Sequence, residues 1–152
     1  MTPFMYIRPA EIADFPVIAS MLHALALEFI VPGMTTGAAS MFLRANDEEA
    51  LLAYRVAGHV TSVAVIDDQI AGFIAIRPPS HVFHLFVAQQ WQRRGVARAL
   101  WEHVVKHACV DTVTYTVNAS PYAVPAYLAL GYQCSGPLAC HKGVSYQPMI
   151  YR

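Results

Sequence analysis

The sequence predicts an α/β fold built on a mixed β-sheet, and three observations point to it. Segments with helical spacing alternate with β-rich segments along the 152 residues. Two β-rich segments flank a short polar turn, as in an antiparallel hairpin, and a later strand–helix–strand succession requires a parallel crossover. Hydrophobic residues make up 56% of the chain and charged residues 13%, so one well-filled core is expected. We therefore expect a single domain over residues 1–152.

The first quarter of the chain predicts a strand followed by an amphipathic helix. Residues 4–8 are β-rich. Apolar side chains then recur at spacings of three and four, ending at Phe29. Asp14 is the expected N-cap, with Pro16 in the first turn, and Pro32 with Gly33 ends the helix.

The middle of the chain predicts a second helix and then three strands. The helix covers residues 38–52, and the strands cover residues 59–66, 70–77 and 82–87. The run Asp67-Asp68-Gln69 joins the first two strands as a hairpin turn.

The last third of the chain predicts two helices and two strands in alternation. These elements cover residues 95–108, 112–117, 122–130 and 144–151. Gly131 suits the position after the shorter helix, and Pro148 is expected to interrupt the last strand. The predicted order is β-α-α-β-β-β-α-β-α-β, with one further β segment at the end.

The charge balance argues against a nucleic-acid partner. Ten basic and ten acidic side chains give a formal net charge of zero, whereas proteins that neutralise phosphates usually carry a basic excess. A nucleic-acid module using Arg93, Arg94 and Arg98 is a rival interpretation that this balance disfavours. The same cluster indicates a smaller anionic ligand nearby.

Cysteine and histidine usage predicts neither a disulfide framework nor a metal site. Three cysteines, Cys109, Cys134 and Cys140, form no CxxC pair. His103 and His107 are spaced as i and i+4, but no third ligand is evident, so no metal is expected.

The N-terminus lacks a basic region followed by an apolar one, and no uninterrupted apolar stretch approaches the roughly 20 residues of a membrane span. We therefore expect a cytoplasmic protein without a membrane partner. The high apolar content also suggests a homodimer.

Residues 92–97 have the composition of a pyrophosphate-binding turn. They connect a strand that ends near Val87 with a helix that begins near Gly95. Glycine lets a ligand approach the backbone closely, and the free N–H groups of a helix N-terminus attract anions. Neither a Walker A loop nor a GxGxxG fingerprint is present. A plain turn with solvated arginines is the alternative.

This run resembles motif A of the GNAT acetyltransferase superfamily, [QR]xxGx[GA], at Gln92, Gly95 and Ala97. Residues 118–132 are similar to motif B of the family, residues 6–14 to its opening strand and helix start, and residues 146–149 to its closing strand. Ala97 stands where a second glycine is commoner. The resemblance implies a mixed, mostly antiparallel sheet of six to seven strands with about four helices.

The resemblance further implies that acetyl-CoA binds as a co-substrate between the fourth and fifth strands. Backbone N–H groups of residues 92–97 would hold the pyrophosphate, and strand backbone would pair with the pantetheine arm. The implied contacts are Leu85, Phe86, Val87, Gln92, Arg93, Arg94, Gly95, Val96, Ala97, Arg98, Asn118, Tyr122 and Tyr127.

The implied reaction is attack of a primary amine on the thioester within a ternary complex. Tyr127 matches the tyrosine with which the family protonates the leaving thiolate; a core tyrosine is the alternative. His81 and His84 are the candidate bases. Alternation along a strand predicts that they face opposite sides, and the family favours the side of His81. A water relay, or a purely surface role for His81, remains open.

The acceptor amine is not readable from the sequence. Residues 28–36, the start of the second helix and residues 136–142 are expected to shape its site, and either a small molecule or a protein amine would fit. A non-catalytic acyl-CoA-binding or sensor domain is the alternative function.

Overall fold

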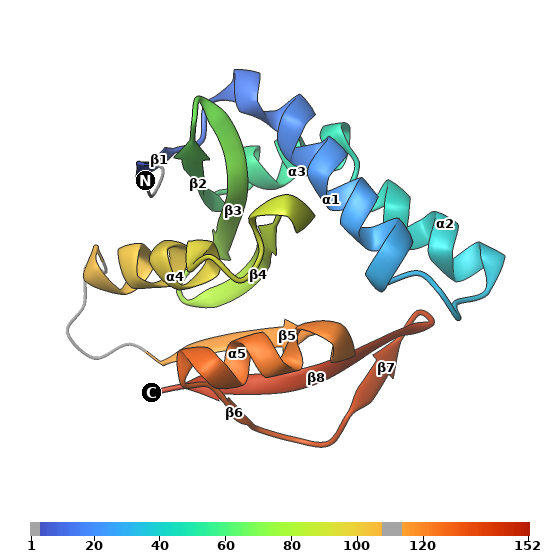
Figure 1. Cartoon of the computed structure of the whole chain (residues 1–152). Coiled ribbons are helices and arrows are strands. Elements are labelled where there is room, and N and C mark those ends of the chain that lie inside the picture. Colours follow the sequence, from blue (N-terminus) through green and yellow to red (C-terminus); the bar gives the residue numbers. More distant parts are fainter. Residues whose placement is uncertain (1–3, 108–113) are drawn as a thin grey trace.

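The computed structural model describes residues 4–107 and 114–152 of the chain. Within them, eight strands form one sheet in the order β1-β2-β3-β4-β5-β8-β6, with β7 paired to β8, and five α-helices surround it (Figure 1). Only β4 and β5 pair in parallel. The predicted mixed, mostly antiparallel α/β fold is confirmed, with one more strand and one more helix than expected.

The strands are β1 (Met5–Pro9), β2 (Val60–Ile66), β3 (Gln69–Arg77), β4 (His81–Val87), β5 (Tyr115–Ala119), β6 (Gln133–Cys134), β7 (Ala139–His141) and β8 (Val144–Tyr151). The α-helices are α1 (Phe15–Phe29), α2 (Thr36–Arg44), α3 (Glu48–Val56), α4 (Val96–Lys106) and α5 (Val124–Leu130). Short 3-10 turns precede three of these helices: η1 (Ile12–Asp14), η2 (Gln89–Trp91) and η3 (Pro121–Ala123).

The single helix predicted over residues 38–52 is two helices, α2 and α3. The chain leaves the helical path at Asn46, whose side-chain amide bonds the carbonyl of Phe42. Asp47 then accepts the N–H of Ala50 at 2.8 Å and caps α3. Asn and Asp compete in this way for helix backbone groups, which explains the break.

Two predictions for the C-terminal third also need adjustment. Pro148 does not interrupt β8, because the strand uses only its carbonyl there, which accepts the N–H of Ser135 at 3.0 Å. In place of the strand predicted at residues 112–117, the described residues contain β5, which begins at Tyr115. The first two residues of the predicted strand, and Cys109, lie outside the described residues.

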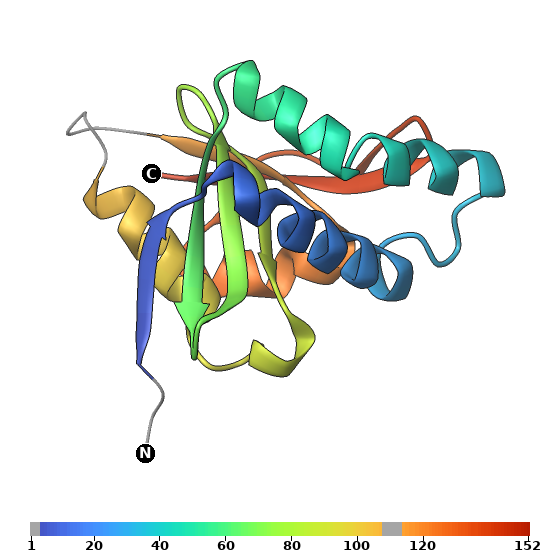
Figure 2. The same ribbon diagram turned by 90° about the horizontal axis from the view of Figure 1, so that it is seen from above.

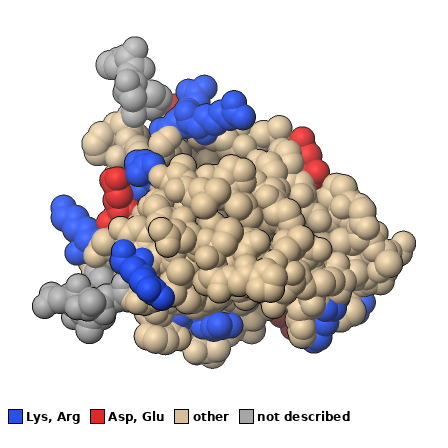
Figure 3. All heavy atoms as spheres, turned by 90° about the horizontal axis from the view of Figure 1, so that it is seen from below, with Lys and Arg blue, Asp and Glu red and all other residues tan. Residues whose placement is uncertain are grey.

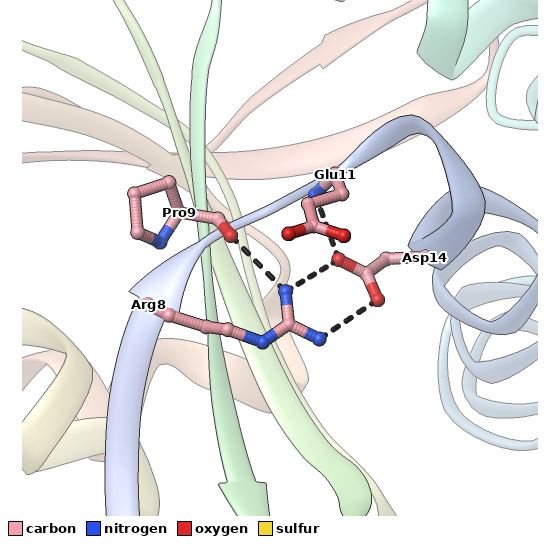
Figure 4. Close-up of polar contacts among 4 residues, drawn as sticks. All are labelled: Arg8, Pro9, Glu11 and Asp14. Carbon is pink, nitrogen blue, oxygen red and sulfur yellow. Dashed lines mark hydrogen bonds and ion pairs between the residues drawn. The ribbon is translucent and has the colours of Figure 1, made fainter.

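The Asp14 side chain stabilises the turn before α1, and it does not cap α1 itself. Its carboxylate binds the Arg8 guanidinium through two hydrogen bonds of 2.7 and 3.0 Å and accepts the N–H of Glu11 (Figure 4). The hydrogen bond from Arg8 lowers the pKa of Asp14 below its usual value. The pair fixes the corner between β1 and α1.

Helices cover both faces of the sheet (Figure 2). The larger apolar cluster joins α4 and α5 to one face, and the smaller one joins α1 and α3 to the other. By length and composition alone, the stretch Ile12–Phe29 is apolar enough to cross a membrane, although Asp14 and Glu28 interrupt it. Here four of its buried side chains share an apolar cluster with β2 and β3: Phe15, Ile18, Leu22 and Ala26.

Charged side chains are sparse on the molecular surface. In the view from below, Lys, Arg, Asp and Glu lie around the margin and leave a broad uncharged area between them (Figure 3). This distribution follows from a composition with only 13% charged residues.

The sheet parts between β4 and β5. Among the described residues, the two strands pair only at His81 with Thr116 and Val82 with Val117, and beyond these pairs they diverge. We call the region between Phe83–Val87 and Asn118–Ala119 the splay. Figure 1 shows β5 and β8, with α5, set apart from β1–β4 on the far side of it.

Candidate functional site

The edge of β4 that faces the splay carries backbone groups that are not paired with β5. The Ala88 N–H donates to the Ala71 carbonyl of β3 at 2.8 Å. Because successive strand residues direct their peptide groups to alternate sides, those of Phe86 face β3 and those of Leu85 and Val87 face the splay. The Phe86 carbonyl accordingly lies 2.8 Å from where a Cβ at Gly72 would stand. The backbone of Phe86 is therefore turned away from the predicted pantetheine position.

A bulge in β4 overturns the prediction that His81 and His84 face opposite sides. Ala75 pairs with His84, and the next residue of β3, Ile76, pairs with Val82. Phe83 is thus an extra residue, which shifts the alternation by one position. Both histidines lie on the face that α1 and α3 cover, whereas Val82 belongs to the opposite cluster.

His81 lies half-buried at the closed end of the splay. Its Nδ1 lies 2.8 Å from the Oγ1 of Thr116 on β5. When Oγ1 accepts from Nδ1–H, Nε2 carries the free lone pair and is available as a base. Burial, with smaller contributions from the charges of Arg77 and His59, lowers the pKa of His81 below 6.5. This shift favours the neutral imidazole at pH 7.

His84 is buried and committed to packing. Its Nε2 donates to the Asn46 Oδ1 at 2.7 Å, because the amide nitrogen of Asn46 is already used on Phe42. Burial lowers the pKa of His84 to about 3. The bond ties the junction between α2 and α3 to the sheet, so the predicted catalytic role of His84 does not fit this placement.

Residues 92–97 form a tight turn into α4. Arg93 and Gly95 both have left-handed backbone, with φ of 62° and 81°. Turns of this kind gather N–H groups into anion-binding concavities. Gly95 is the N-cap of α4, and no atom lies within 4 Å of the position of a Cβ there. The start of α4 is therefore open to a ligand.

Val96 and Ala97 form the first turn of α4 behind this opening. Val96 is buried against the sheet, with its Cγ1 3.1 Å from the position of a Cβ at Gly72. A side chain at residue 72 would push β4 and α4 apart. Gly72 thus sets the separation between the β4 edge and the helix N-terminus.

The three clustered arginines have different surroundings. Arg93 is exposed at the turn, and the Arg94 guanidinium lies 5.5 Å from the centre of the Trp91 ring, within cation–π range. Arg98 donates to the Ala129 carbonyl at 2.8 Å and so links α4 to the last turn of α5. Arg93 and Arg94 are the better placed of the three for a ligand at residue 95.

Gln92, Asn118 and Tyr122 surround the splay from both strands. The Gln92 amide donates to the Val87 carbonyl at 3.0 Å and accepts from the Tyr122 hydroxyl at 3.2 Å. Asn118 is exposed on β5, in register with Pro148 of β8. These predicted cofactor contacts therefore lie at the region where β4 and β5 part.

Tyr127 lies on α5 in the larger apolar cluster, only 5% exposed. Its ring meets that of Tyr132 edge-on at 5.2 Å. Burial raises the pKa of Tyr127 above its ordinary value of 10, so the phenol holds its proton firmly at neutral pH. The Tyr127 hydroxyl is therefore better suited to donating a hydrogen bond than to transferring its proton completely.

His103 and His107, at the C-terminal end of α4, are joined by a local hydrogen bond. The His107 Nδ1 donates to the His103 carbonyl at 2.8 Å. Within residues 4–107 and 114–152, no group of three His, Cys, Asp or Glu side chains is arranged to hold a metal ion.

Two residues that our sequence analysis missed, and one that it included only in the predicted acceptor region at residues 28–36, contact the predicted site. Thr116 binds His81, Asn46 binds His84, and Phe29 stacks on Tyr122 with ring centres 4.3 Å apart. Thr116 lies on the same strand face as Asn118, so strand alternation was a usable signal. Asn46 lies far from His84 in sequence and carried no such signal, and Phe29 was expected only as part of the acceptor region at residues 28–36.

Solved structures share this fold along almost the whole chain. A GCN5-related N-acetyltransferase from Rhodopseudomonas palustris has a TM-score of 0.78 and 23% identity over 99% of this chain and 97% of its own. The PaiA N-acetyltransferase from Thermoplasma acidophilum, in complex with coenzyme A, has a TM-score of 0.75 and 14% identity over 97% and 98%. YncA from Salmonella typhimurium, with its cofactor acetyl-CoA, has a TM-score of 0.69 and 17% identity over 97% and 93%.

No curated protein is similar enough in sequence to count as a match. A family model does match, described as an acetyltransferase (GNAT) domain, over residues 31–152. That range contains the splay, the turn at residues 92–97 and both candidate catalytic side chains. The chain belongs to the GNAT acetyltransferase family.

Proposed function

We propose that the protein transfers an acetyl group from acetyl-CoA to a primary amine by direct attack in a ternary complex. The observation that carries this proposal is the splay, where the edge of β4 at Leu85 and Val87 is not paired with β5 and the N-terminus of α4 at Gly95 is open. The family supports acetyl transfer, and the solved relatives with coenzyme A and acetyl-CoA support the choice of donor.

The residues around the splay fit the parts of such a donor. The turn at Arg93 and Gly95 directs N–H groups to where a pyrophosphate would sit, and the helix dipole favours its charge. Leu85 and Val87 offer backbone groups to the amides of the pantetheine arm. Asn118 and Tyr122 would contact the arm from the side of β5.

The proposed chemistry assigns separate tasks to His81, Val87 and Tyr127. The neutral His81 Nε2 takes a proton from the ammonium form of the acceptor, directly or through a water, because only the free amine is a nucleophile. The amine nitrogen then bonds to the carbonyl carbon, and the Val87 N–H donates to the developing oxyanion.

Breaking the C–S bond then releases a thiolate, with a reference pKa of about 8.5. The Tyr127 hydroxyl donates to this sulfur. Burial raises the pKa of Tyr127, so its hydrogen bond is the main stabilisation of the thiolate. The proton moves from Tyr127 to the sulfur only to the degree that the site stabilises the phenolate. The products are an amide and CoA.

The direct test is an acetyl-CoA turnover screen across amine classes, with release of the CoA thiol and formation of the acetylated product both measured. We expect stoichiometric product with at least one primary amine. If calorimetry detects acetyl-CoA binding but no amine is acetylated, the protein is a non-catalytic acyl-CoA-binding domain instead. Absence of any acetyl-CoA binding would overturn the proposal.

A further inference from the structure

A single side-chain amide spans the two sides of the splay. The Gln92 Nε2 donates to the Val87 carbonyl on β4 at 3.0 Å, and its Oε1 accepts from the Tyr122 hydroxyl at 3.2 Å. Tyr122 belongs to η3, which follows β5. Gln92 therefore connects the two strands beyond the point where they stop pairing with each other.

The β4 group that accepts the hydrogen bond from Gln92 is the Val87 carbonyl, and it points away from β3. The bond from the Ala88 N–H to Ala71 assigns Ala88 to the β3 side, so the Val87 carbonyl faces the splay. A ligand that pairs with β4 as an added strand needs this carbonyl as an acceptor.

The Tyr122 hydroxyl is oriented by a second contact. The Phe29 ring, at the end of α1, stacks on the Tyr122 ring with centres 4.3 Å apart and planes inclined by 11°. Tyr122 is otherwise 48% exposed. The stack holds an exposed tyrosine so that its hydroxyl meets the amide on the Val87 carbonyl.

We propose that the Val87 carbonyl and the Tyr122 hydroxyl together recognise an amide of the pantetheine arm, and that Gln92 is an internal competitor for this position. An amide presents one N–H donor and one carbonyl acceptor, and Gln92 shows both in use. Acetyl-CoA displaces the Gln92 amide, and Phe29 positions Tyr122 in both states. This inference rests on the proposed function.

The competitor sets how tightly the arm binds. Each bond that Gln92 makes in the free protein must be exchanged for one to the ligand, which reduces the net gain on binding. Removing the Gln92 amide therefore improves recognition of the arm, and it leaves recognition of the phosphates unchanged except through the backbone of residue 92.

The test compares two ligands by calorimetry: CoA, and adenosine 3′-phosphate 5′-diphosphate, which lacks the pantetheine arm. The measured quantity is the Kd of the fragment divided by the Kd of CoA, because any disturbance of the phosphate turn cancels in this ratio. For Gln92→Ala we expect the ratio to rise about two- to tenfold, the equivalent of one typical net hydrogen bond.

The neighbouring exposed Gln90, substituted as Gln90→Ala, is the matched control and should leave the ratio at the wild-type value. Tyr122→Phe keeps the stacking ring and removes the hydroxyl. In the wild-type background, Tyr122→Phe loses one hydrogen bond in the free protein and one in the complex, so the ratio of the two Kd values changes little. In the Gln92→Ala background, Tyr122→Phe loses a hydrogen bond in the complex but none in the free protein, so the ratio should fall.

An unchanged or lowered ratio in Gln92→Ala overturns the inference, as does an equal effect of Tyr122→Phe in both backgrounds. A wild-type protein that binds neither CoA nor acetyl-CoA overturns the proposed function instead, so the two failures are distinguishable.

Discussion

The Nδ1 of His81 lies 2.8 Å from the Oγ1 of Thr116, across the short stretch over which β4 and β5 still pair. This contact places an imidazole with a lowered pKa at the closed end of the splay. It also couples the tautomer of the candidate base to a hydroxyl of the neighbouring strand.

The first prediction concerns His81 as the base. His81→Ala should lower kcat/KM most at low pH and recover partly at high pH, where more of the amine is already unprotonated. The measurement is a pH–rate profile from about pH 6 to about pH 9.5, below the reference pKa of about 10.4 for an alkyl amine. Profiles of the same shape for both proteins would indicate a water relay or another base.

A companion variant tests the contact with Thr116. Thr116→Val keeps the β-branched shape on β5 and removes only Oγ1. If that oxygen fixes the tautomer with Nε2 free, kcat should fall by less than in His81→Ala, with the KM for the amine little changed. A wild-type rate and pH profile for Thr116→Val would mean that the hydroxyl does not position the base.

The second prediction concerns Tyr127. Tyr127→Phe should lower kcat by at least about tenfold, and by up to the 10²–10⁴ typical of acid catalysis, with acetyl-CoA affinity little changed. Packing should survive, because the ring that meets Tyr132 is retained. The variant is measured in single-turnover experiments, where product release does not hide the chemical step. Full activity there would make Tyr127 a core residue only.

The third prediction concerns the phosphate turn. Gly95→Asp should weaken CoA binding by at least about fivefold, since a carboxylate about 4 Å from a phosphate is repelled by about 1–4 kcal/mol. Gly58→Asp is the matched control: Gly58 also has left-handed backbone, with φ of 110°, and open space at its Cβ position. Calorimetry should show wild-type affinity for the control. Equal affinities for both variants would contradict the assignment of the turn.

The fourth prediction concerns acid stability. Burial lowers the pKa of His84 to about 3 in the fold, against an ordinary value of 6.5, so below pH 6.5 the unfolded chain binds more protons. The resulting stability is present above pH 6.5 and is lost as the pH falls towards about 3. His84→Gln keeps a donor for Asn46 and removes the titration.

The free energy of unfolding is compared by urea denaturation at about pH 7.5 and about pH 5. Between these values the wild type should lose more stability than His84→Gln, by about 1.4 kcal/mol for each pH unit below 6.5. Parallel losses in the two proteins would show that His84 titrates normally in the fold.

The sequence by itself determined most of the elements, their approximate order and the turn at residues 92–97. Each depends on neighbours in the chain: the spacing of apolar residues up to Phe29 predicts α1, and Gly95 at the start of a helix predicts a turn that a ligand can approach closely. The similarity to motif A could be found for the same reason, because its residues lie within one turn.

Only the tertiary structure decided which side chains meet. β3 and β4 pair out of step at a bulge at Phe83, and simple alternation therefore wrongly predicted that His81 and His84 face opposite sides. Thr116, Asn46 and Phe29 reach His81, His84 and Tyr122 across long sequence separations. Periodicity carries no information about such contacts, because they are set by how the elements pack and by where β4 and β5 part.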